Sequence, residues 1–96
     1  MIKNITTPNV KFSDRFDEQL KNASDGTKES FVETLYLFLE DPNHPMLRHH
    51  ALKEKLVGYR SIDVTEDYQA VFKETYSAKK RFITFHMIGT HGQLYG

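Results

Sequence analysis

Two closely spaced prolines, Pro42 and Pro45, separate two parts of the chain that have different hydrophobic periods. Before them, Phe31, Leu35 and Phe38 recur at the spacing of one helix face. After them, apolar and polar residues alternate over residues 61–65, which is the period of a strand. Proline pushes the preceding residue away from helical angles, so a helix should end near Asp41. The order of helices first and strands later predicts an α+β domain.

The first part predicts a helical hairpin preceded by a short strand. Residues 2–10 are rich in β-branched side chains, and Pro8 would confine such a strand to a sheet edge, because proline cannot donate to the ladder. Ser13 is a helix-capping residue, and the apolar stripe of this helix has i+4 spacing, with Phe12, Phe16 and Leu20. Residues 23–26 break this helix, and Thr27 is the expected cap of the next one. So short a break favours two antiparallel helices.

The second part predicts a β-meander with strands at residues 61–65, 68–75 and 81–88. Residues 47–58 suggest an irregular basic segment, and residues 94–96 suggest a terminal tail. With 96 residues, of which 39% are hydrophobic, the chain has material for one core. We therefore expect a single domain over residues 1–96, in which an N-terminal helical hairpin packs on a small, mostly antiparallel sheet.

Several functional classes are disfavoured by what the sequence lacks. Without cysteine, the chain has no disulfide and no thiolate-bound metal. It has neither an apolar run of about 18 residues nor a recognisable signal peptide, so a cytoplasmic protein without a membrane partner is expected. Phosphate-binding loops, dinucleotide fingerprints and zinc-protease motifs are also missing. We therefore expect neither a cofactor nor a metal.

The zero net charge conceals an uneven distribution. Residues 1–45 carry five cations against eight anions, whereas residues 46–96 carry eight cations against five anions. The second part also contains four of the five histidines. A polyanionic partner for this part is one interpretation, and mutual neutralisation of the two parts within the fold is the other.

Histidines and carboxylates that can transfer protons lie beside the ends of the expected strands. His50 precedes the meander, Asp63 and Asp67 belong to its first hairpin, and His91 follows its last strand. If the strands align as predicted, these groups converge at one end of the sheet and suit acid–base chemistry on a phosphate. A lone histidine is more often structural, so the inference depends on this convergence.

The same region resembles the RelE/ParE toxin superfamily and is most similar to its YafQ branch. The motifs are LRHHALK at residues 47–53, GYRSI at 58–62, DY at 67–68, IGTH at 88–91 and LYG at 94–96. The resemblance extends from about Pro45 to the C-terminus, and the helical hairpin agrees in outline. It implies the RelE/ParE-like fold and a ribosome-dependent endoribonuclease toxin of a type II toxin–antitoxin pair. Such a toxin cuts mRNA in the ribosomal A site and inhibits translation. Its implied partners are the ribosome, mRNA and a cognate antitoxin. Operator DNA would be bound only through the antitoxin.

The resemblance also implies residue roles for a metal-independent cut, in which the ribose 2′-hydroxyl attacks the neighbouring phosphate. We expect His91 to be the general acid and His50, polarised by Asp67, the general base. Tyr95 occupies the terminal aromatic position associated with activity. The cationic residues expected to contact phosphate or RNA are Lys53, Lys55, Arg60 and Arg81.

Two positions depart from the pattern of the relatives. Asp63 stands where close YafQ relatives have a histidine counted in the active site, and Gln69 stands where many superfamily members have a phosphate-stabilising arginine. Each change removes positive charge from the expected site. Two alternatives therefore stay open, a ParE-like toxin that inhibits gyrase by protein contact and a catalytically weakened toxin that acts mainly by binding its antitoxin.

Overall fold

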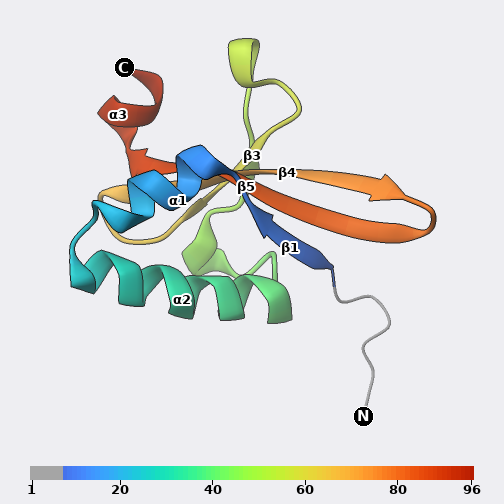
Figure 1. Ribbon diagram of the computed structural model, residues 1–96, viewed down its shortest axis with the longest axis horizontal. Coiled ribbons are helices and arrows are strands. Elements are labelled where there is room, and N and C mark those ends of the chain that lie inside the picture. The colour runs from blue at the N-terminus through green and yellow to red at the C-terminus, as the bar shows by residue number, and fades with distance from the viewer. Residues whose placement is uncertain (1–7) are drawn as a thin grey trace.

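A computed structural model describes residues 8–96, which form three α-helices, two short 3-10 helices and a five-stranded sheet (Figure 1). The strand predicted for residues 2–10 lies largely outside the described residues. The elements in chain order are β1 (Asn9–Phe12), α1 (Asp14–Lys21), α2 (Asp25–Glu40), η1 (Pro45–Leu47), β2 (His50–Ala51), η2 (Glu54–Leu56), β3 (Arg60–Asp63), β4 (Tyr68–Ser77), β5 (Lys80–Thr90) and α3 (His91–Tyr95).

The sheet confirms the α+β class and the predicted meander, but its strands are mixed in direction. The strand order is β1-β5-β4-β3-β2. Strands β2 to β5 pair with one another in antiparallel fashion. Strand β1 lies at the edge of the sheet and pairs in parallel with β5, with Asn9 opposite Phe82. A parallel neighbour needs a long crossover connection, and the helices together with the first strands of the meander provide it. The expectation of a mostly antiparallel sheet is therefore only partly confirmed.

Serine side chains begin both N-terminal helices. In α1 the Ser13 hydroxyl accepts a hydrogen bond from the Phe16 amide at 3.0 Å, as predicted. In α2 the cap is Ser24 rather than the expected Thr27, whose own amide donates to the Ser24 hydroxyl at 3.1 Å. Gly26 thus lies inside the first helical turn instead of ending a break. The helix finishes at Glu40, directly before Asp41 and the first proline of the loop.

The two helices pack on one face of the sheet through a cluster of phenylalanine rings. Phe85 of β5 is fully buried at its centre, with ring centroids of five other phenylalanines 5.4 to 6.3 Å away. These five are Phe12, Phe16, Phe31, Phe38 and Phe72. Phe12, predicted to belong to the first helix stripe, ends β1 instead. The predicted hairpin is thus matched in part, since Phe16 of α1 contacts Phe31 of α2 at 5.0 Å.

The segments before and after the meander contain short elements that the sequence did not predict. The expected tail is α3, which begins with a capping box made by Thr90 and Gln93. The expected irregular segment contains η1, β2 and η2. In Figure 1, α3 and the loop that contains η2 project from the side of the sheet away from α2. No helix within residues 8–96 is long and apolar enough to span a membrane.

Truncating the central ring tests the packing of this core. The substitution Phe85→Ala should lower the free energy of unfolding by about 3–5 kcal/mol, because it removes a fully buried aromatic ring and leaves a cavity. The matched control is Phe12→Ala, which should cost less, because 41% of Phe12 is already exposed. Equilibrium chemical denaturation measures both values, and equal losses would contradict a core centred on Phe85.

Candidate functional site

A row of polar side chains crosses the sheet on the face away from α1 and α2. Side chains alternate along a strand, so Ser61 and Asp63 point away from the core residue Ile62 between them. In the ladder, His50 of β2 is opposite Ser61, and Asp63 is opposite Gln69 of β4. Pairing across three strands therefore brings these groups to one surface.

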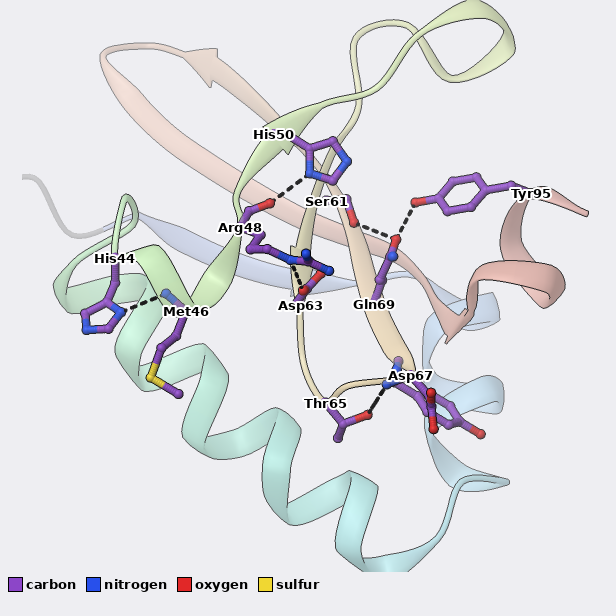
Figure 2. Close-up of polar contacts among 11 residues, drawn as sticks. His44, Met46, Arg48, His50, Ser61, Asp63, Thr65, Asp67, Gln69 and Tyr95 are labelled. Carbon is purple, nitrogen blue, oxygen red and sulfur yellow. Dashed lines mark hydrogen bonds and ion pairs between the residues drawn. The ribbon is translucent and has the colours of Figure 1, made fainter.

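Gln69 connects this row to the C-terminal helix. Its side-chain oxygen accepts one hydrogen bond from the Ser61 hydroxyl at 3.2 Å and another from the Tyr95 hydroxyl at 3.0 Å (Figure 2). Because the oxygen holds both bonds, the amide nitrogen keeps two donors for a further partner. The roles of Ser61 and Gln69 as anchors of Tyr95 were not predicted, since they depend on where α3 returns to the sheet.

The ring of His50 is oriented by the backbone beside it. Its Nδ1 lies 2.8 Å from the carbonyl oxygen of Arg48, which can only accept. The neutral ring therefore carries its proton on Nδ1 and leaves Nε2 unprotonated. His50 is exposed. The arrangement suits a base that takes a proton at Nε2.

Asp67 does not hold His50 in place. It lies exposed in the turn between β3 and β4, where its backbone amide donates to Thr65 Oγ1 at 3.2 Å. Figure 2 shows Asp67 well apart from His50, whose Nδ1 partner is the Arg48 carbonyl. Asp67 instead lies toward the start of α3, since the next residue, Tyr68, pairs with Thr90.

His91 and Tyr95 come together on α3. The four-residue spacing places their rings on one helix face, with centroids 4.8 Å apart. Since the Tyr95 hydroxyl is fixed on Gln69, this contact also limits where His91 can lie. The structure thus links two of the predicted site residues directly.

A basic groove adjoins Tyr95. It measures about 510 Å³ and lies between the η2 loop, the start of α1 and α3. Lys53 and Lys55, both predicted, line it together with Arg15, which was not, and with one anion, Glu54. Met87, Leu56 and Leu94 contribute apolar surface. Cations around apolar surface suit a nucleotide, whose phosphates are charged and whose base is flat.

Two predicted RNA-contacting arginines lie elsewhere. Arg60 precedes Ser61 on β3, so its side chain points to the opposite face of the sheet. There its Nε donates to His49 Nε2 at 2.7 Å. Arg81 pairs with Glu74 in the part of the β4–β5 hairpin far from Gln69. Burial raises the pKa of Glu74, but hydrogen bonds from Arg81 and Tyr76 outweigh it and hold that pKa below its usual value. The structure therefore does not bring Arg60 or Arg81 to His50.

Two further histidines have pKa values that their surroundings lower. Burial lowers the pKa of His49 below its usual value, and the charge of Arg60 acts in the same direction. His49 donates from Nδ1 to the Pro42 carbonyl at 3.0 Å and accepts from Arg60 at Nε2, so both ring nitrogens have partners. Burial and the charge of Lys73 lower the pKa of His86. Within residues 8–96, no cluster of histidines and carboxylates could hold a metal ion.

Solved structures resemble this one over nearly the whole chain. A crystal structure of YafQ from E. coli strain BL21(DE3) is 25% identical with a TM-score of 0.71, covering 93% of this chain and 99% of that one. The E. coli DinJ–YafQ toxin–antitoxin complex is 20% identical with a TM-score of 0.72, covering 94% and 99%. A YoeB/ParE toxin from Agrobacterium tumefaciens is 13% identical with a TM-score of 0.71, covering 86% and 98%. No family model and no curated protein sequence matches the chain.

The lowered pKa of His49 leads us to expect that the folded protein loses stability in mild acid. Its pKa is lowered in the folded state, so the unfolded chain binds more protons as pH falls through the usual value of 6.5, and unfolding becomes easier. The variant His49→Gln should lose part of this dependence, and His49→Gln/His86→Gln should lose more, because His86 is shifted in the same direction. Thermal denaturation between pH 7.5 and 5.5 measures it. An unchanged pH dependence in both variants would contradict the assignment.

Proposed function

Because the chain has the RelE/ParE-like toxin fold in its YafQ-like form, we propose that it is the toxin of a type II toxin–antitoxin pair. We further propose that it is an endoribonuclease that cuts mRNA in the ribosomal A site and thereby inhibits translation in the cytoplasm. The observation that carries the proposal is one surface on which the Arg48 carbonyl holds His50 through Nδ1 and His91 contacts the anchored Tyr95. A protein that only blocks gyrase by contact has no need of such groups.

The proposed reaction needs one base and one acid. His50 Nε2 takes the proton of a ribose 2′-hydroxyl, and the 2′-oxygen then attacks the adjacent phosphorus. His91 gives a proton to the departing 5′-oxygen as the P–O5′ bond breaks. The products are a 2′,3′-cyclic phosphate and a 5′-hydroxyl end, so atoms and protons balance without a metal.

The neighbouring groups are assigned to substrate positioning. Tyr95 faces His91 and lines the basic groove, so its ring stacks on a nucleotide base. Lys53 and Lys55 contact phosphates on the other side of that groove. Arg60 and Arg81 lie away from His50, and we assign them to ribosomal RNA rather than to the cut phosphate.

The proposed protein partner is a cognate antitoxin. The fold is the one that YafQ presents in the solved DinJ–YafQ toxin–antitoxin complex. We propose that such an antitoxin neutralises this chain, and that operator DNA is reached only through that complex.

The substitution His91→Gln should abolish translation-dependent mRNA cuts and growth arrest, because glutamine cannot donate the proton that the 5′-oxygen needs. Primer extension after induction in a bacterial host, with and without a translation inhibitor, measures the cuts. The control is His44→Gln, on a histidine whose side chain accepts a hydrogen bond from the Met46 amide. Growth arrest without cuts in the unmodified protein would point to a protein target such as gyrase. The absence of arrest would point to a weakened toxin.

The substitutions His50→Asn and His50→Gln should each lower the cleavage rate by about 100- to 10,000-fold, because neither side chain accepts a proton as imidazole does. Asparagine can still donate to the Arg48 carbonyl from the position of Nδ1, so His50→Asn should keep the melting temperature of the unmodified protein. Purified toxin and programmed ribosomes give the rates. A rate within tenfold of the unmodified protein in either variant would remove His50 as the base.

A further inference from the structure

We propose that Arg48 supplies the positive charge that stabilises the cut phosphate, and that Asp63 is a positioning residue that holds Arg48 in place. The inference rests on the proposed function and deepens it. It assigns a role to a residue outside the expected catalytic set, and it changes the role expected for Asp63 from acid–base chemistry to orientation.

The contact between these residues is close and partly shielded. Arg48 Nε lies 2.7 Å from Asp63 Oδ2, and the Asp63 side chain keeps only 17% of its surface exposed. The Arg48 side chain is 73% exposed. One end of the pair is thus fixed against the sheet, while the other faces solvent beside His50 (Figure 2).

The geometry leaves most of the guanidinium group available. Arginine has five N–H donors, and Asp63 occupies the one on Nε. The donors on the two terminal nitrogens remain for a ligand, and their planar arrangement matches phosphate oxygens. Among residues 8–96, the ion pairs are Arg48–Asp63, Arg81–Glu74 and Lys28–Asp25, and only the first lies on the row of His50, Ser61 and Gln69.

Arg48 also controls the orientation of the proposed base. Its carbonyl oxygen accepts a hydrogen bond from His50 Nδ1, and its backbone adopts the left-handed conformation, with φ of 44°. This conformation turns the chain between η1 and β2, so the carbonyl faces His50 while the side chain reaches Asp63. One residue therefore connects the base to the anion on the neighbouring strand.

Charge explains why Asp63 is tolerated on this surface. Attack by the 2′-oxygen builds negative charge on the phosphate oxygens, and an unpaired carboxylate nearby would oppose that change. Paired with Arg48, Asp63 adds no net charge to the site. Gln69 places a neutral amide in the middle of the row, and the guanidinium of Arg48 is the cation that pairs with Asp63 on this face.

The test measures cleavage rates for Arg48→Ala, Asp63→Ala and the double variant, using purified toxin and programmed ribosomes. Arg48→Ala should lower the rate by about 100- to 1,000-fold, as expected for removal of a donor to the developing oxyanion. Asp63→Ala should lower it less. In the Arg48→Ala background, Asp63→Ala should lower the cleavage rate further by less than about twofold, because Asp63 acts through Arg48.

The pH–rate profile separates positioning from acid–base chemistry. Asp63→Asn should lower the maximum rate and leave the shape of the profile unchanged, whereas loss of one limb would assign Asp63 to proton transfer and overturn the proposal. Arg48→Lys keeps the charge without the planar fork, and it should recover part of the rate lost in Arg48→Ala. It also serves as the informative variant if alanine prevents folding, which thermal denaturation reports.

The matched control is Lys28→Ala, which removes the cation of an exposed ion pair near the start of α2 and should cleave normally. If the unmodified protein cleaves and Arg48→Ala cleaves equally well, this inference fails while the proposed function stands. If the unmodified protein does not cleave, both fail together.

Discussion

The packing of five phenylalanine rings around Phe85 is the constraint on which the rest of the structure depends. It attaches α1 and α2 to one face of the sheet and also fixes β1 at its edge, because Phe12 joins the same cluster. Close-packed interiors admit few rearrangements, so this contact decides which way each strand faces. Once Ile62, Ala70 and Phe85 point toward the helices, Ser61 and Gln69 must point away from them.

The candidate site follows from that division. The polar face is left to short elements, namely β2, the η2 loop and α3, and each is attached by a small number of hydrogen bonds. Tyr95 is held by Gln69, and His50 is held by the Arg48 carbonyl. The scaffold is thus close-packed where the rings meet, and the candidate site residues project from its opposite surface.

Alternation and helical spacing were enough to predict the meander, α2 and the overall class, because these signals reflect which side chains must be buried. The predicted cap of α2 was wrong by three residues, because Ser24 and Thr27 both carry a hydroxyl that can cap a helix. The capping box of Thr90 and Gln93 was a readable signal for α3 that was missed. The parallel pairing of β1 had no local signal, because a strand's neighbour is chosen by contacts distant in the sequence.

The sequence by itself determined the kinds of chemical groups in this protein and the periods of its elements, because both are local properties of the chain. The roles expected for His50, His91 and Tyr95 came instead from the family resemblance, as did those of Lys53 and Lys55, and they stay predictions. Only the tertiary structure decided which groups meet. It placed Arg15 beside the lysines, gave His50 a carbonyl partner instead of Asp67, and paired Asp63 with Arg48. Strand register and ring packing set these distances, and both depend on residues far apart in the chain.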